Sequence, residues 1–301
     1  MFRFQRLVVP LSMSETDAGL LRYASLVAGL GVTRRVHFVH VITPVRSPAG
    51  VATPREVQSK MERVVGAHFA EANGGASLEC HAIEGTRIDR LVAFSIEKKA
   101  DLILLGSGKS RARRRSLAER LAMITSCSVW SVPDGSPDRI ERILAPVDFS
   151  DHSADSLGVA AALARLQDLD AIEALHAVST ATAVGGNEQS HASRESERRG
   201  FREFLTRTNG QGIAVDSVIQ KGSQPADAIL RHAWLTKADL IVMSTRGTGP
   251  KRENLLGSAT AQILAEAPMP VLAVKHFDPQ ASFFGALDAH ESLIRADVRT
   301  S

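Results

Sequence analysis

The feature that most constrains the fold of this chain is an internal repeat. Four segments of the first half recur in the same order in the second half, at separations that grow from 136 to 142 residues. The matched pairs are Leu7–Pro10 with Ile143–Pro146, Val36–Val41 with Ile172–Ala177, Ala100–Leu105 with Ala238–Met243, and Ser128–Val132 with Pro270–Val274. One chance match between apolar strands is ordinary, but four in order indicate a duplicated unit with small changes in loop length.

The length agrees with a duplication, because 301 residues suffice for two domains of about 150 residues each. We predict a first domain over residues 1–135, a second over residues 140–276 and a C-terminal tail over residues 277–301. In each half, short β-branched runs alternate with longer amphipathic stretches. This alternation predicts an α/β fold: two tandem five-stranded parallel sheets with helices on both faces.

The second half gives the clearest expected elements. The expected strands are Arg142–Pro146, Ala171–Val178, Val215–Gln220, Ala238–Ser244 and Pro270–Val274. The expected helices are Ser153–Leu166, with Ser150 or Ser153 as its cap, Arg194–Thr208, Pro225–Leu235 and Ser258–Ala265.

Composition narrows the function classes. The net charge of +3 is weak evidence for a polyanionic partner, and only 5% of the residues are aromatic. The basic cluster Lys109–Arg115 is therefore interpreted as a solvated loop in preference to a nucleic-acid patch. Cys80 and Cys127 form no metal or redox motif and are expected to be reduced thiols. No run is apolar and long enough to span a bilayer, and the chain opens on a strand, so we expect a cytoplasmic protein without a membrane partner.

In parallel sheets of this kind, ligands bind beyond the carboxyl ends of the strands. At that edge the second half has Ser244–Gly247, then nine residues, then Gly257 and Ser258 opening a helix. The glycines allow close backbone approach, and the first N–H groups of the helix favour a phosphate. Asp148 follows the first strand, where it could bind a ribose, hold a divalent ion or serve the next helix as a cap.

The first half has lost these features. Gly106–Lys109 is followed by five residues and then Arg115, so the loop is four residues shorter, and Ser12 stands where the second half has Asp148. His40 and His176 end the second strand of their halves and are expected to be packed, structural histidines. These features predict a phosphate site in the second half. The first half has Lys109 and Arg115 at the corresponding positions, and binding of another anion there stays open.

These residues resemble the universal stress protein family. The resemblance rests on Ala145–Ser150, Leu175–His176, Ala238–Gly247, Gly257–Ser258 and Ala267–Val274, and it covers both halves. The family motif is Gly, two residues, Gly, nine residues, Gly, then Ser or Thr; the second half departs from it only at Ser244. The resemblance implies adenine-nucleotide-hydrolase-like domains with flavodoxin-like layering that bind ATP with Mg²⁺ or Mn²⁺. The implied nucleotide-binding residues are Pro146, Asp148, Ala177, Ser244, Gly247, Gly257, Ser258 and Ala259.

The family also implies that the last strands pair, here as an internal pseudo-dimer of Val129–Val132 with Val271–Val274, or in a homo-oligomer. The expected function is that of a stress-response or regulatory protein that acts by binding ATP and an unidentified protein partner. We expect no enzyme, because no acid, base and nucleophile set is present; slow ATP hydrolysis stays open by family analogy. The alternatives are a nucleotide-independent scaffold of the same fold and an enzyme of the adenine-nucleotide-hydrolase-like group.

Overall fold

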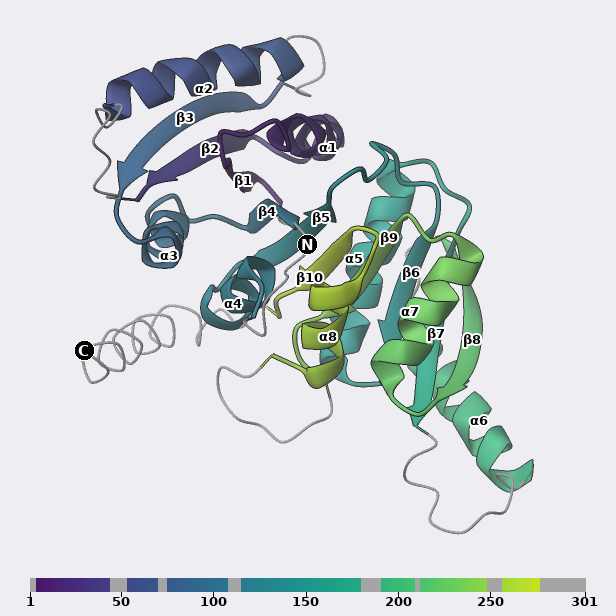
Figure 1. Cartoon of the computed structure of the whole chain (residues 1–301). Helices are drawn as coiled ribbons and strands as arrows, with labels where there is room; N and C mark the ends of the chain where they lie inside the picture. Colours follow the sequence, from purple (N-terminus) through teal and green to yellow (C-terminus); the bar gives the residue numbers. More distant parts are fainter. Residues whose placement is uncertain are drawn as a thin grey trace, which may run out of the picture. The chain divides into compact units, whose positions relative to one another are not determined.

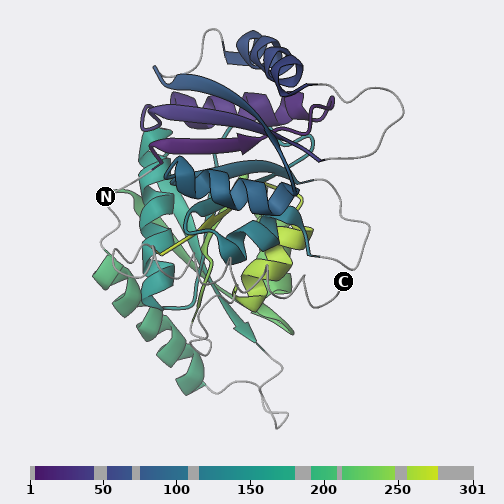
Figure 2. The same cartoon turned by 90° about the vertical axis from the view of Figure 1, so that its left-hand side faces the viewer.

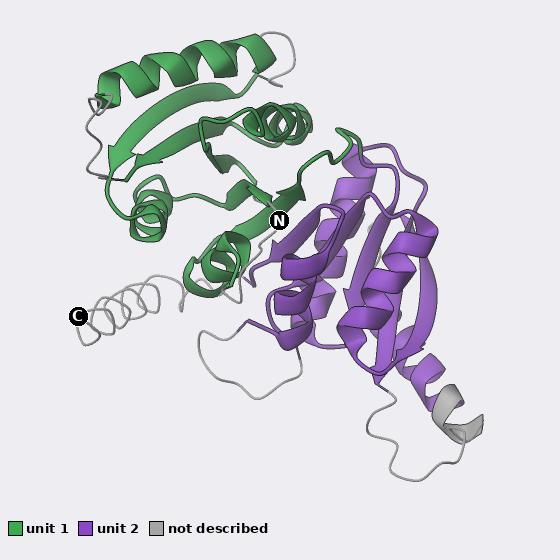
Figure 3. Cartoon of the chain, viewed as in Figure 1, with its two compact units in different colours: residues 1–139, 277–301 green, residues 140–276 purple. Residues whose placement is uncertain are grey.

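In a computed structural model the chain forms two compact units, Met1–Arg139 and Ile140–His276 (Figure 3). The structure describes residues 4–43, 53–69, 75–107, 115–179, 191–208, 212–247 and 256–276, with side chains from residue 195 onward in the fifth range. The predicted tail over residues 277–301, the basic cluster except Arg115, and most of the loop before Gly257 lie outside these ranges. The predicted pairing of the two units through their last strands stays a prediction.

The first unit alternates strands and helices along its whole length (Figure 1). Its elements are β1 (Arg6–Pro10), α1 (Asp17–Gly29), β2 (Arg35–Ile42), α2 (Pro54–Phe69), β3 (Ser77–Glu84), α3 (Arg87–Glu97), β4 (Leu102–Ser107), α4 (Leu117–Ile124) and β5 (Ser128–Pro133). All strand pairs of the unit are parallel, in the order β3-β2-β1-β4-β5. The chain thus winds from β1 in one direction and then returns to the other side of it.

The second unit repeats this architecture. Its elements are β6 (Ile143–Val147), α5 (Asp151–Leu166), β7 (Ala171–Ser179), α6 (His191–Thr208), β8 (Ala214–Gly222), α7 (Pro225–Thr236), β9 (Leu240–Ser244), α8 (Ser258–Glu266) and β10 (Val271–Val274). Its parallel order is β8-β7-β6-β9-β10, the counterpart of the first sheet. The prediction of two tandem α/β domains with parallel sheets is confirmed.

Helices cover both faces of each sheet. In the first unit α1 packs beside α2 and α3 beside α4, and the two pairs lie on opposite faces, which the views in Figures 1 and 2 show from two sides. In the second unit α5 pairs with α6 and α7 with α8 in the same way. This explains why the central strands are buried on both sides: Leu7, Val8 and Val9 of β1 are fully inaccessible.

Local sequence signals explain most of the helix boundaries. The Ser150 side chain accepts from the N–H of Ser153 and caps α5, and Pro225 occupies the first turn of α7. The end of α7 gave no sequence signal: Lys237 takes the left-handed conformation there, with φ 54°. Within the described ranges, no helix combines the length and the apolar character needed to cross a membrane.

Candidate functional site

The candidate site lies at the carboxyl edge of the second sheet, between β6 and β9. From β6 the chain moves outward through β7 and β8, then returns to place β9 and β10 on the other side, so this edge is a topological switch point. Pro146 explains why the pairing of β6 with β9 stops before the end of β6. The parallel register of β6 with β9 ends at Leu144, whereas that with β7 continues to Val147, because proline has no N–H to donate toward β9.

Asp148 is held rigidly at the end of β6. Its Oδ1 accepts from the N–H of Ser150 at 3.2 Å and from the Ser150 hydroxyl at 2.5 Å. Ser150 in turn caps α5, so Asp148 supports the cap without itself capping the helix. The turn depends on Phe149, which has a positive φ of 66° and stacks on His176 at 4.1 Å between ring centroids.

The second carboxylate oxygen of Asp148 faces the loop after β9. A methyl carbon added to Gly247 would clash with Oδ2 of Asp148, so a side chain at this position would force the carboxylate to move. Gly247 itself is exposed. The structure thus brings together two predicted site residues that lie 99 positions apart in the sequence, one from each side of the switch point.

The remaining residues of the predicted phosphate motif are held by hydrogen bonds to backbone carbonyl groups. The N–H of Gly257 donates to the carbonyl of Thr245 at 2.9 Å, and the Thr260 hydroxyl donates to the carbonyl of Ser244 at 2.8 Å. The Ser244 hydroxyl donates to the carbonyl of Arg246. These contacts hold the start of α8 beside the end of β9.

The N-terminus of α8 lacks a side-chain cap. Gly257 is the N-cap residue and has no side chain to offer, and among the described residues, which exclude 248–255, no side-chain hydrogen bond closes this end of the helix. Ser258, the first helical residue, is exposed, and Ala259 is half-buried. The first N–H groups and the positive end of the helix dipole are therefore available to an anion. Ala177 of β7 lies one residue beyond the last β6–β7 register pair, near the same edge.

The two histidines at the ends of the second strands have a structural role. Nδ1 of His176 lies 2.9 Å from the carbonyl oxygen of Val147, and Nδ1 of His40 lies 2.9 Å from that of Leu11. Each imidazole holds the loop that follows the first strand of its unit. This agrees with the prediction of packed histidines.

The corresponding loop of the first unit also contains a carboxylate, but hydrogen bonds from the same loop occupy it. Asp17 is buried and accepts from the N–H and hydroxyl of Ser12 at 3.0 and 2.8 Å and from the N–H of Met13 at 2.7 Å. Met13, with φ 64°, is the counterpart of Phe149. The fold of the loop is conserved between the units, but the carboxylate points into it instead of toward β4.

The helix N-terminus of the first unit is also closed. Ser116 accepts from the N–H of Glu119 at 3.1 Å, and Glu119 accepts from the N–H of Ser116 at 2.6 Å. This capping box satisfies the groups that an anion would otherwise bind at the start of α4. A cavity of about 230 Å³ remains at this edge, lined in part by Ser12, Gly106 and Pro133. The two units therefore share a fold and differ in the chemistry of the same edge.

The fold and the site define a class of protein: a tandem α/β protein with two parallel, doubly wound units, in the second of which Asp148 and Gly247 meet at the switch point. The Usp family model, "Universal stress protein family", matches residues 3–133 and again residues 139–275. The chain belongs to the universal stress protein family, and it contains the family domain twice.

Similar proteins agree with this assignment. A universal stress protein of Thermus aquaticus is 45% identical over 64 residues, which are 21% of this chain and 47% of that protein. Universal stress protein MJ0531 of Methanocaldococcus jannaschii is 29% identical over 141 residues, 45% of this chain and 82% of its own length. The crystal structure of a universal stress protein from Archaeoglobus fulgidus has the same fold with a TM-score of 0.68 at 20% identity, covering 91% of this chain and 99% of its own.

Proposed function

We propose that this protein binds one ATP in its second unit and acts as a cytoplasmic stress-response or regulatory protein through binding, without catalysis. The observation that carries the proposal is the meeting of Asp148 and Gly247 beside the uncapped start of α8. A carboxylate suited to ribose hydroxyls and a helix terminus suited to phosphates then lie at one switch point. Cys80 and Cys127 are not joined in a disulfide, which fits a reducing compartment.

The proposed contacts follow from this placement. Asp148 accepts from the ribose, and the backbone near Ala177 meets the adenine. Gly247, Gly257, Ser258 and Ala259 surround the phosphates, with Ser244 at the start of the loop. Mg²⁺ or Mn²⁺ accompanies the phosphates, and the carboxylate of Asp148 is of the ligand type that Mg²⁺ accepts.

A role in binding is favoured over catalysis by what the polar groups of this edge already do. The Ser150 hydroxyl donates to Asp148 and accepts from the N–H of Ser153, so its hydrogen bonds serve the turn and the helix cap. The Ser244 and Thr260 hydroxyls donate to backbone carbonyls. Each of these groups positions the loops, which suits a site that holds a ligand without transforming it.

The second candidate is a nucleotide-independent scaffold of the same fold, and the observation that favours it is Ser244. The serine replaces the first motif glycine, and its hydroxyl is engaged by the loop itself. In this alternative the edge would be occupied by its own loop, and the protein would act through oligomerisation or a protein partner.

Mass spectrometry of the supernatant of freshly purified, denatured protein separates the two candidates. Adenine nucleotide recovered near one equivalent per chain supports the proposal. Calorimetric titration of nucleotide-free protein with ATP, and with cAMP, which is bound in one solved universal stress protein structure, then tests the ligand. A folded protein that neither retains nor binds a nucleotide contradicts the proposal in favour of the scaffold.

A further inference from the structure

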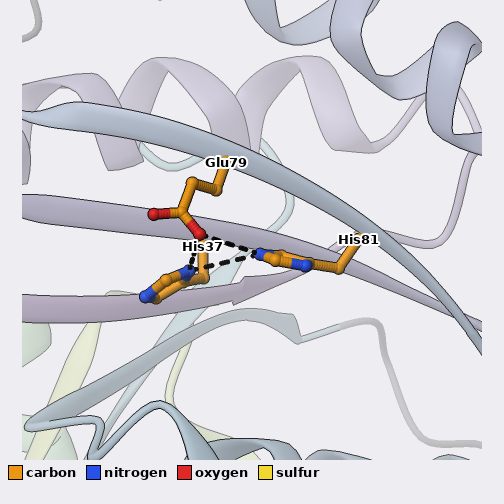
Figure 4. A group of neighbouring side chains, drawn as sticks. All are labelled: His37, Glu79 and His81. Carbon is orange, nitrogen blue, oxygen red and sulfur yellow. Dashed lines mark hydrogen bonds and ion pairs between the residues drawn. The ribbon is translucent and has the colours of Figure 1, made fainter.

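Three side chains converge on one point on the α3-facing side of the first sheet, toward the amino ends of β2 and β3 (Figure 4). They are His37 of β2 and Glu79 and His81 of β3. Glu79 and His81 are two residues apart on a strand and therefore share a face, and His37 is the register partner of Glu79. Both histidine rings pack edge-on against Phe94 of α3, with centroids at 6.0 and 4.9 Å.

The distances between the three potential ligand atoms are nearly equal. Nδ1 of His37 lies 3.3 Å from Nε2 of His81 and 3.3 Å from Oε2 of Glu79, and Nε2 of His81 lies 3.5 Å from the same oxygen. In a tetrahedral Zn²⁺ site with bonds of about 2.0–2.1 Å, neighbouring ligand atoms are about 3.3–3.4 Å apart. The triangle has the size of one face of such a tetrahedron.

Hydrogen bonds between the neutral rings and the carboxylate account for at most two of the three contacts. A neutral imidazole has one N–H and the carboxylate has none, so the two rings cannot supply a well-directed proton to each of the three contacts. A divalent cation at the centre would instead accept all three lone pairs at once.

The surroundings supply a second shell and a route of entry. The other oxygen of Glu79 faces the guanidinium of Arg35 at 3.5 Å, which fixes the carboxylate. His37 is 2% exposed, but His81 and Glu79 are 23% and 40% exposed, so an ion can enter from their side. Lys98 also lies near the cluster, and its positive charge would repel a metal ion. The Lys98 ammonium is paired with Glu97 at 3.0 Å, which offsets part of this repulsion.

The cluster is a property of the first unit and not of the repeated fold. The register positions that correspond to His37, Glu79 and His81 in the second unit are occupied by Glu173, Asp216 and Val218. No imidazole stands at any of the three. Cys80, between Glu79 and His81, points to the opposite face, where burial and Glu62 of α2 raise the pKa of its thiol to about 11.

We propose that His37, Glu79 and His81 form a binding site for one Zn²⁺ ion in the first unit, with the fourth position open to water or to a ligand from outside. Two imidazole nitrogens and one carboxylate oxygen select a first-row transition metal over Mg²⁺ or Ca²⁺. The site is independent of the proposed nucleotide site, because it lies in the other unit and on a sheet face instead of the carboxyl edge of the strands.

The test is calorimetric titration of the full chain, without affinity tag and after removal of metals with EDTA, with Zn²⁺ alone. We expect one Zn²⁺ per chain in the wild type. His81→Gln and Glu79→Gln remove partly exposed ligands and should each weaken binding by more than about tenfold. Arg35→Met, which frees the carboxylate, should weaken it by about tenfold. Melting curves identify any variant that fails to fold, and Zn²⁺ should raise the Tm of the wild type but not of His81→Gln.

The matched control is His152→Gln. His152 and His276 of the second unit are stacked at 4.8 Å, next to Asp155, and are the obvious competing place for an adventitious ion. This variant should bind Zn²⁺ like the wild type. Cobalt(II) provides a second readout, since four-coordinate Co²⁺ absorbs strongly in the visible range. Absence of binding in the wild type, unchanged affinity in His81→Gln, or loss in His152→Gln alone would each overturn the proposal.

Discussion

Gly247→Ala tests whether Asp148 and the loop after β9 act together. The added methyl carbon would clash with Oδ2 of Asp148, and the carboxylate cannot simply turn away, because Oδ1 is held by two hydrogen bonds from Ser150. The displaced carboxylate loses its contact with the nucleotide. A hydrogen bond to a charged group contributes about 1.5–3 kcal/mol, so the Kd for ATP should rise roughly 10- to 150-fold.

A double-mutant cycle makes this prediction specific. Asp148→Ala should weaken ATP binding by a similar amount, about 1–3 kcal/mol, by removing the carboxylate itself. Once Oδ2 is gone, the added carbon of Gly247→Ala meets nothing, so the double variant should bind ATP no worse than Asp148→Ala. The two effects are then strongly non-additive. Asp216→Ala, which removes an exposed carboxylate near the amino end of β8, is the charge control and should leave Kd unchanged.

Titration calorimetry on all five proteins gives the coupling energy, with melting curves to confirm folding. Additive losses in the double variant would refute the contact between Asp148 and Gly247 as the basis of the effect. Wild-type affinity in Gly247→Ala would refute the placement of the nucleotide at this edge.

Three further predictions concern stability. Asp17→Ala should lower the free energy of unfolding of the first unit by about 2–3 kcal/mol, because it removes the acceptor of three partly buried hydrogen bonds. An unchanged urea midpoint would contradict the role of Asp17 in the loop. Ser116→Ala should cost about 1 kcal/mol in the same assay by opening the capping box with Glu119, and a neutral result would contradict it. Lys237→Gly should instead stabilise the second unit, by about 0.5 kcal/mol, since glycine adopts the left-handed conformation without strain; a lower Tm would contradict it.

The fold could be predicted from the sequence because each strand pattern of the first half occurs again in the second half. Each apolar run that is ambiguous alone is matched at a nearly constant separation, and the expected elements of the second half differ from the observed ones by only a few residues at their ends. The helix α6, for example, starts at His191 instead of Arg194. Such shifts are ordinary, because helix and strand ends are set by local hydrogen bonds that a periodic pattern does not encode.

The candidate site was predictable in its location but not in its contacts. Motif spacing located Gly247 and Gly257, but only the structure places Oδ2 of Asp148 against Gly247 or leaves the start of α8 uncapped. The internal use of Asp17 was missed, because a carboxylate five residues after Ser12 looks like an ordinary first-turn acid. These features depend on the direction of side chains in the folded loops, and the spacing of residues along the sequence does not determine that direction.

The histidine cluster was missed for a different reason. Glu79 and His81 have the two-residue spacing of one strand face, and that signal was present in the sequence. His37, however, becomes their neighbour only through the β2–β3 register, which depends on where β3 starts. A search for pairs of ligating residues at strand spacing, combined across neighbouring strands, would have found it.

We propose that only the second unit binds ATP, and the number of ATP molecules bound per chain, measured by calorimetric titration, tests this directly. The account predicts one site per chain, weakened by Asp148→Ala and unaffected by Lys109→Ala in the first half. Two equivalent sites per chain, or a single site that survives Asp148→Ala but disappears in Lys109→Ala, would contradict it.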